Sequence, residues 1–525
     1  TTVTISSLLR RLGRSNSGQG RSVPRRHISG RMRNADSMLQ RTVSCAAAAC
    51  IVVAASQAVA GDWQWQPRFS TSITHTDNAT FQRDARESDT IAQIRPGLSV
   101  RGQGARLQAA LEYNLDRRQS LQDVIPNGTQ HQLQAQGSAE LVEDHGFIDA
   151  SAFRTQVNID NRLGNTFNNR VGNFGNLANV SNVVVSPYWR QHFSSFADAE
   201  VRGTYSVVKN DSQDVVPNRN LAFADTTNRS LGLTVTGGRQ FSLTPWSLQL
   251  NASEVEFGGG ATSEFNTVRF NLGYRFSPSW LFDVTLGYDQ NEFASVNEVS
   301  GETWLLGGEW TPSERITVDF SAGQRFFGTT KQGSVRYRRR HTELSVNYSE
   351  NVQTNNRLFN GFSPLSSGRF TNFAGLNPGR FGQVGVRQDT PTLNDQVFLL
   401  KRLDARLNWQ RRRNNASFQM FRFDREDQGE RGLSEDAIGF TFRFGRTLSR
   451  QASVNLFTSW QTRTFGLTNE ESRFIRISPT YSYRVSENLD LNLSYSRFDT
   501  EGEGRGGGFG GFDENQVTVT LTYLP

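Results

Sequence analysis

The sequence predicts an all-β protein, a transmembrane antiparallel up-and-down β-barrel of about 16 to 22 strands, with about 22 as the best count. Three observations predict this fold. Residues 1–60 have the composition of a secretory leader, residues 61–525 alternate repeatedly between apolar and polar positions, and short turns alternate with long polar loops. Because outer-membrane barrels combine short periplasmic turns with longer external loops, we expect the protein in the bacterial outer membrane.

The first sixty residues carry the signature of a secretory signal peptide. They contain nine arginines and a single acidic residue, Asp36, followed by an apolar run at 43–55 and by Ala58-Val59-Ala60. A basic segment, a short apolar segment and an A-x-A site together predict cleavage after Ala60. The apolar run, about thirteen residues long, is shorter than the roughly twenty that a membrane-spanning helix needs.

The leader also accounts for the basic charge of the chain. Of the 57 Lys and Arg and the 50 Asp and Glu, nine and one lie in the leader, which leaves 48 and 49 and a net charge of −1 for residues 61–525. Both cysteines, Cys45 and Cys50, also lie in the leader. The mature segment therefore has no thiol for a disulfide or a metal, and its charge gives no reason to expect nucleic acid as a partner.

Alternation of apolar and polar residues predicts the strands. It is clearest in segments 246–253, 268–276, 282–289, 438–445, 489–496 and 517–523. Successive strand residues point to opposite faces, so each segment has one apolar and one polar side. Soluble proteins also contain amphipathic strands, but about twenty of them, each roughly ten residues long, match tilted strands that cross a bilayer.

The last of these segments is the expected C-terminal assembly strand. Its apolar side consists of Val517, Val519, Leu521 and Tyr523. This is the strand that we expect the barrel-assembly machinery to bind, and outer-membrane lipid to surround once the barrel is inserted.

The connections between strands fall into two groups. We expect short turns at 276–280, 311–315, 338–341, 447–451 and 485–489, and long loops at 116–130, 158–182, 209–228, 352–395 and 499–515. Aromatic residues close many of the apolar series, where interfacial girdles are expected. These residues are Tyr113, Tyr205, Tyr274, Tyr288, Trp409, Trp460, Tyr495 and Tyr523.

Five further segments carry a family resemblance. They are WQPRF at 65–69, THTDN at 74–78, GQRFFG at 323–328, YRRRH at 337–341 and LSVNYSE at 344–350. Together with the strand rhythm of the mature chain, they resemble the outer-membrane proteins associated with exosortase/PEP-CTERM systems, which are related to β-barrel porins of exopolysaccharide clusters. The resemblance implies a barrel linked to envelope biogenesis or exopolysaccharide export, with an exopolysaccharide or its export proteins as partners.

The polar faces of the expected strands carry the candidate site residues. Arginine facing lipid at mid-depth costs about 2–4 kcal/mol, so we expect the arginines of these strands to face the lumen. The candidate lumen charges are Arg202, Arg269, Arg275, Arg406, Arg443 and Arg476, accompanied by Glu112, Glu200, Asp283, Asp319, Asp404 and Asp490. Two interpretations stay open: paired charges that brace the barrel, or unpaired arginines that select anions or an anionic polysaccharide.

Nothing in the sequence indicates an enzyme, a cofactor or a metal site. The histidines of the mature segment are scattered, without H-x-x-x-H or H-E-x-x-H spacing, and no G-x-S-x-G occurs. We therefore expect a channel or export component linked to exopolysaccharide secretion. Two alternatives remain: a non-conducting scaffold or adhesin-like barrel, whose loops bind glycans or partner proteins while loop 352–395 plugs the lumen, and a general porin.

Overall fold

The structure, a computed structural model, describes residues 61–158, 177–211, 225–258, 260–293, 296–354, 397–427, 434–466, 470–502 and 511–525. The predicted leader, including Ala58 and Ala60 at its cleavage site, lies outside these residues. The described chain forms 22 strands and a three-residue 3-10 helix, η3 (Arg239–Phe241). Among the described residues, no helix is both long and apolar enough to span a membrane.

The first eleven strands are β1 (Gly61–Thr76), β2 (Asp89–Gly104), β3 (Leu107–Ser120), β4 (Gly128–Val142), β5 (Gly146–Asn158), β6 (Leu177–Phe193), β7 (Ala197–Asp211), β8 (Thr226–Gly237), β9 (Trp246–Phe257), β10 (Thr262–Ser277) and β11 (Trp280–Phe293). The other eleven are β12 (Val296–Ser313), β13 (Ile316–Arg325), β14 (Gly328–Arg339), β15 (Thr342–Thr354), β16 (Val397–Arg411), β17 (Asn414–Asp427), β18 (Glu435–Thr447), β19 (Ala452–Phe465), β20 (Glu470–Ser486), β21 (Leu489–Gly502) and β22 (Phe512–Tyr523).

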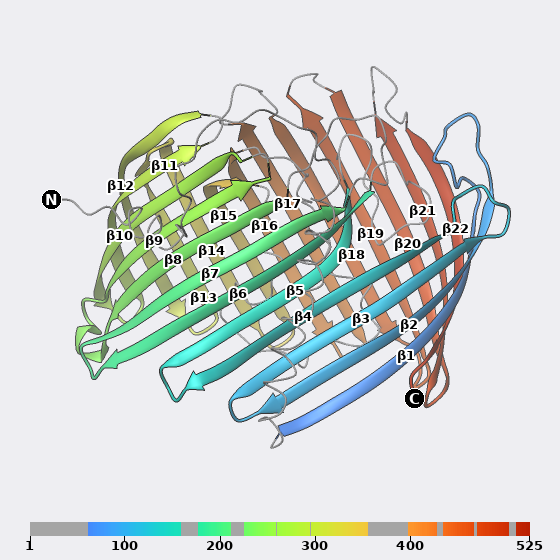
Figure 1. Ribbon diagram of the computed structural model, residues 1–525, viewed down its shortest axis with the longest axis horizontal. Coiled ribbons are helices and arrows are strands. Elements are labelled where there is room, and N and C mark those ends of the chain that lie inside the picture. The colour runs from blue at the N-terminus through green and yellow to red at the C-terminus, as the bar shows by residue number, and fades with distance from the viewer. Residues whose placement is uncertain are drawn as a thin grey trace, which may run out of the picture.

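These strands close into one barrel. Each strand pairs antiparallel with the next along the chain, and β1 also pairs with β22 (Figure 1). This closing seam runs from Phe69 opposite Tyr523 to Thr76 opposite Gln516. The closed ladder satisfies backbone hydrogen bonds without leaving a sheet edge in lipid, which is the condition for a membrane-spanning sheet. The predicted up-and-down barrel and its best strand count are confirmed.

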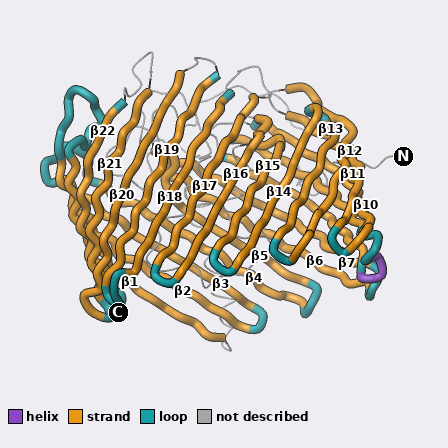
Figure 2. Tube along the Cα trace, turned by 180° about the vertical axis from the view of Figure 1, so that it is seen from behind, coloured by secondary structure: helices purple, strands orange, loops and turns teal. Residues whose placement is uncertain are grey.

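Tight turns gather at one end of the barrel (Figure 2). All five predicted short turns fall between consecutive strands; the one predicted at 338–341, for example, lies where β14 ends at Arg339 and β15 begins at Thr342. Gly61 and Tyr523 lie at the same end, because they pair next to the β2–β3 and β20–β21 turns. We call this the periplasmic end and the opposite one the outer end, since short turns mark the periplasmic side.

The strands run further into the predicted long loops than the sequence indicated. The loop predicted at 116–130 shrinks to 121–127, because β3 continues to Ser120 and β4 begins at Gly128. Strands are 10 to 18 residues long rather than about ten. Above the hydrocarbon layer the ladder continues, but an apolar outward face is no longer required, so the alternation fades before the strand ends. Most of the other predicted loop residues, including 355–396, lie outside the described residues.

An apolar belt covers the outside of the barrel. On β10 and β11, Phe270 is 40 % exposed and Leu286 is 54 % exposed. The predicted girdle residues Tyr205, Tyr274, Tyr288, Tyr495 and Tyr523 are likewise exposed, as are Val517, Val519 and Leu521 of the predicted assembly strand. In water such a surface would aggregate, whereas in a bilayer it meets acyl chains.

Candidate functional site

The inner wall of the barrel is identified by alternation with this belt. Arg269 lies between the exposed Val268 and Phe270, so its side chain points to the lumen. The same alternation and the strand registers put all six predicted arginines on the inner wall: Arg202, Arg269, Arg275, Arg406, Arg443 and Arg476. They divide into three groups, so the structure does not bring all six together.

Arg202 and Arg269 are paired with carboxylates. Arg202 donates to Asp149 and to Glu200 at 2.9 Å each, and its guanidinium lies 3.8 Å from the centre of the Tyr188 ring. Arg269 forms an ion pair of 3.3 Å with Asp289. The Arg202–Asp149 contact joins β7 to β5 across β6, and the Arg269–Asp289 pair joins the neighbouring strands β10 and β11, as expected for charges that brace the barrel.

Arg443 and Arg476 lie instead against phenylalanine rings. Both guanidinium carbons are near Phe457, at 5.0 and 5.1 Å from the ring centre, and Arg476 is also 5.0 Å from Phe498. Positive charge over an aromatic face is a cation–π contact. Phe457 and Phe498 were missed by the sequence analysis, although each is an aromatic residue in the polar phase of its strand.

Arg275 and Arg406 lie towards the periplasmic end, where both are exposed. Arg275 donates through Nε to the Ser242 carbonyl at 3.4 Å, and Arg406 donates to the Gln419 side chain at 3.4 Å. They face an aqueous part of the lumen, away from the phenylalanine contacts.

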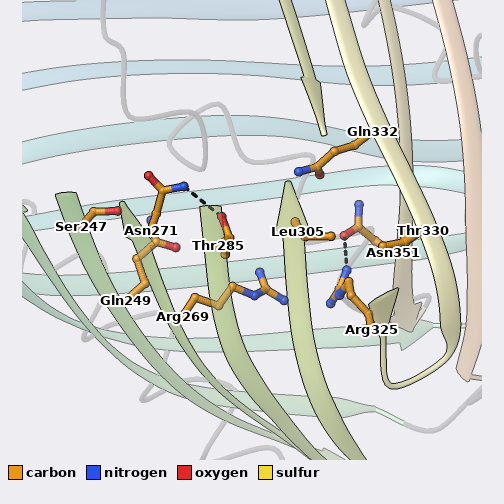
Figure 3. A pocket seen from close by; sticks show the side chains of 10 residues that line it. All are labelled: Ser247, Gln249, Arg269, Asn271, Thr285, Leu305, Arg325, Thr330, Gln332 and Asn351. Atoms are coloured by element: carbon orange, nitrogen blue, oxygen red, sulfur yellow. Dashed lines mark hydrogen bonds between the residues drawn. The ribbon is translucent and has the colours of Figure 1, made fainter. Parts of the chain in front are cut away.

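A polar cavity of about 230 Å³ opens in the inner wall (Figure 3). Seven strands, β9 to β15, supply its lining: Ser247, Gln249, Arg269, Asn271, Thr285, Leu305, Arg325, Thr330, Gln332 and Asn351. Asn271 donates to Thr285 at 2.9 Å, and Arg325 donates to Asn351 at 3.3 Å. Amides, hydroxyls and two guanidinium groups thus converge on a space large enough for one sugar residue or a small anion.

Two guanidinium groups share one carboxylate at the Arg325 side of the cavity, while a second carboxylate, that of Asp283, lies behind the lining residue Asn271, which donates to it at 3.0 Å. Asp289, only 1 % exposed, lies between Arg269 at 3.3 Å and Arg325 at 3.7 Å and accepts from Thr303 at 2.6 Å. One carboxylate neutralises at most one of two guanidinium groups. Within the part of the chain that the structure describes, the buried Arg269 Nε makes no hydrogen bond, and the Arg325 Nε meets Asp289 only at the ion-pair distance of 3.7 Å. The arrangement can therefore accept a carboxylate, a phosphate or sugar hydroxyls.

A second charged cluster lies in the wall at the outer end. Glu435 accepts from Arg463 at 2.5 Å and from Arg425 at 3.1 Å, and all three side chains are at most 9 % exposed. Phe423 lies under both guanidinium groups. The sequence analysis did not single out this cluster, because it depends on the register that places Arg425 opposite Glu435 and on the packing of Arg463 from β19.

The closed ladder, the outward apolar belt and the polar, charged inner wall define the class: this protein is a transmembrane β-barrel of the outer membrane. No protein-family model matches the chain, and no curated protein sequence matches it.

Solved structures share the fold at very low sequence identity. The FrpB iron transporter from Neisseria meningitidis has a TM-score of 0.50 and 10 % identity over 88 % of this chain and 83 % of that chain. The siderophore receptor PirA from Acinetobacter baumannii gives 0.48 and 9 % over 88 % and 80 %. The ferric enterobactin receptor PfeA from Pseudomonas aeruginosa gives 0.47 and 12 % over 88 % and 80 %. At such identities the likeness concerns the fold alone.

Proposed function

We propose that the protein is an outer-membrane conduit for a polysaccharide and serves exopolysaccharide secretion beside an exosortase/PEP-CTERM-type system. The observation that carries the proposal is the placement of arginine on phenylalanine, at Arg443, Arg476 and Phe457, on a wall that faces water. An aqueous pore has no physical need for phenylalanine there. A sugar ring has an apolar C–H face that packs on an aromatic ring and hydroxyls or carboxylates that accept from guanidinium groups.

The cavity supports the same role. Its arginines and amides offer donors to hydroxyl and carboxylate groups, and they lie on the wall that a passing chain would touch. The neighbouring structures are named as a transporter and receptors, which agrees with a transport role and with the expectation that the chain is not an enzyme.

The test is conductance of the purified protein in a planar bilayer. We expect ion current that oligosaccharides of a uronate polymer block, because they occupy the wall lined by arginine and phenylalanine. Arg443→Gln and Arg476→Gln should each weaken this block by about tenfold, the scale of a desolvated cation–π contact. The matched control is Arg497→Gln, on the exposed outward face of β21. Absence of current from the intact protein, or equal block of all variants, would contradict the proposal.

A second candidate is the non-conducting scaffold. It is favoured by the burial of inner-wall side chains at the outer end, where Phe421, Phe423 and Phe498 are each 1 % exposed. Side chains of a water-filled pore would be more exposed than this. Current that is absent from the intact protein and appears after deletion of residues 355–396, which lie outside the described residues, would support this candidate over the conduit.

A further inference from the structure

At one place on the outer rim of the barrel, two strands end earlier than the strands on either side of them. Strands β13 and β14 form a short hairpin whose turn consists of Phe326 and Phe327. On one side β12 continues past Trp304, the last residue that pairs with β13, as far as Val296. On the other side β15 continues to Thr354. We call the space above this hairpin, between β12 and β15, the notch.

Below the notch the backbone ladder between β14 and β15 is incomplete. It runs from Arg339 opposite Thr342 to Gly333 opposite Tyr348 and stops there. Both strands continue towards the outer end, over residues 328–332 and 349–354, and within this described part of the chain no register pair joins them. Each segment is still fully paired on its other side, with β13 and with β16.

Two long side-chain hydrogen bonds replace the missing backbone pairs. The Lys331 amide donates to the Glu350 carboxylate at 3.3 Å, and Arg325 reaches past β14 to donate to Asn351 at 3.3 Å. Such distances are at the long end for N–H···O hydrogen bonds. This seam is therefore held by weaker links than a continuous antiparallel ladder provides.

Aromatic rings close the notch. Phe326 and Phe327 meet edge to face at 5.1 Å and pack against the apolar cluster formed at the outer end by β9–β11, β15 and β16. Phe326 lies directly on Gly301 of β12, where a Cβ atom would be 3.0 Å from it. A side chain at position 301 would therefore crowd the hairpin turn, which glycine allows to approach closely.

The notch begins where the outward surface becomes charged. Tyr348 belongs to the last backbone pair. Beyond it, Lys331 is exposed and Lys401 forms an ion pair with Glu426, whereas Glu350 is buried and accepts from the Tyr348 hydroxyl. Aromatic residues mark the interface of a bilayer, and charges follow them on the aqueous side. The notch is therefore at the height of the lipid headgroups rather than of the acyl chains.

The cavity reaches the notch from the lumen side. Four of its lining residues, Arg325, Thr330, Gln332 and Asn351, belong to the hairpin and to β15 (Figure 3). The guanidinium carbon of Arg325 also lies 4.9 Å from the centre of the Phe327 ring, so the same side chain lines the cavity and contacts the aromatic pair at the notch. A ligand held between Arg269 and Arg325 would adjoin the weak seam.

We propose that the notch is a lateral exit: a hydroxyl-rich, carboxylate-bearing polymer held in the cavity leaves between β12 and β15 when Phe326 and Phe327 move aside. This inference rests on the proposed function and adds the route. The polymer then emerges at the headgroup layer of the outer leaflet, where its anionic groups can remain bound to the cell surface.

Cysteine cross-linking tests the route, because neither native cysteine, Cys45 nor Cys50, lies in residues 61–525, which contain the barrel. Gln332→Cys with Ser349→Cys would close the seam one step beyond the last backbone pair. The control pair is Thr74→Cys with Thr518→Cys, whose native hydroxyls are 2.9 Å apart on a complete ladder. The assay is the flux of a uronate oligosaccharide through proteoliposomes, with and without reductant, and a short bismaleimide replaces the disulfide if the thiols do not meet.

The expected result is a flux about tenfold lower in the closed 332/349 variant, restored by reductant where the link is a disulfide, with no change in the control. Equal flux through both cross-linked variants would mean that the polymer leaves along the barrel axis, which overturns the notch and leaves the conduit intact. If neither the unsubstituted protein nor any cysteine variant, cross-linked or reduced, transports the oligosaccharide, the proposed function is wrong.

If no form of the protein shows flux, hydrogen exchange of the backbone amides still tests whether the notch exists. The β15-facing amides of segment 329–332, those of Thr329 and Lys331, should exchange at least about tenfold faster than the β15-facing amides of segment 334–339, such as those of Val335 and Tyr337, because the ladder to β15 covers only the latter. The amides of Thr330 and Gln332 point to β13, whose ladder continues there. Equal protection of the two segments would overturn the notch independently of any transported substance.

Discussion

Glu435 and Arg463 form an ion pair of 2.5 Å inside the wall of the barrel, with exposed side-chain fractions of 9 % and 1 %. Arg425 adds a second guanidinium to the same carboxylate. Two buried guanidinium groups thus share the Glu435 carboxylate, and the Phe423 ring lies beneath both of them. Removing the shared carboxylate is more damaging than removing either cation, because it leaves like charges together.

Glu435→Ala should lower the free energy of unfolding by about 3–5 kcal/mol, the usual effect of breaking a buried pair. The measurement is urea unfolding in detergent micelles, followed by the gel-mobility difference between folded and unfolded barrel. The control is Glu426→Ala, which removes a half-exposed outward partner of Lys401 and should cost about 0–1 kcal/mol. Equal losses would show that the inner cluster does not carry this stability.

Leu286→Arg should destabilise the inserted barrel by about 2–4 kcal/mol, because it places a guanidinium in lipid. Its neighbour Thr285 lines the cavity, so Thr285→Arg meets water and polar groups and should cost much less. Unfolding in lipid vesicles measures both. If the two substitutions cost the same, the assignment of inner and outer faces on β11 is wrong.

Gly323→Ala should prevent normal pairing of β12 with β13, because a Cβ atom there would lie 2.0 Å from the Trp304 carbonyl oxygen. Only backbone movement relieves such a contact, at a cost of about 1–3 kcal/mol. Gly137→Ala is the control, since its Cβ would lie 3.5 Å from the Gln108 carbonyl oxygen. The folded fraction after refolding into detergent compares them; a normal yield for Gly323→Ala would contradict the predicted clash.

Arg325→Gln should shift ion selectivity towards cations. It leaves Asp289 with Arg269 alone and makes the net charge of the cavity wall one unit more negative. The reversal potential under a salt gradient across a planar bilayer reports this shift, and Arg497→Gln on the outward face should leave it unchanged. If Arg325→Gln has the same reversal potential as the unsubstituted protein, the ions do not pass the cavity.

The strands, their two faces and their turns could be predicted from the sequence, but the side-chain contacts on the inner wall could not. Alternation of period two assigns Arg269 and Phe270 to opposite faces, and turn residues locate the end of β14 near Arg339. Both signals are local, as is the leader pattern, whose residues the structure does not describe. Height above the membrane and the exact register between neighbouring strands are not given by local patterns. The Arg425–Glu435–Arg463 cluster, which depends on that register, therefore could not be predicted from the sequence.

Departures from the expected pattern were the informative positions. Phe457 breaks the polar phase of β19 and lies under two arginines. Segment 323–328, noted only for a family resemblance, forms the hairpin tip at the notch. A residue that contradicts its local pattern is under a constraint from elsewhere in the fold.

The seam between β1 and β22 has a consequence for how the barrel forms. All other strand pairs join neighbours along the chain, whereas Ser70 and Thr522, whose hydroxyls are 3.2 Å apart, are 452 positions apart in sequence. Bringing such distant segments together carries the largest loop-closure entropy in the molecule. Hairpins can therefore accumulate early, while closure waits for the last strand to be made. Until then two unpaired edges remain open to other chains, so the time before closure is when this protein is most prone to misassembly.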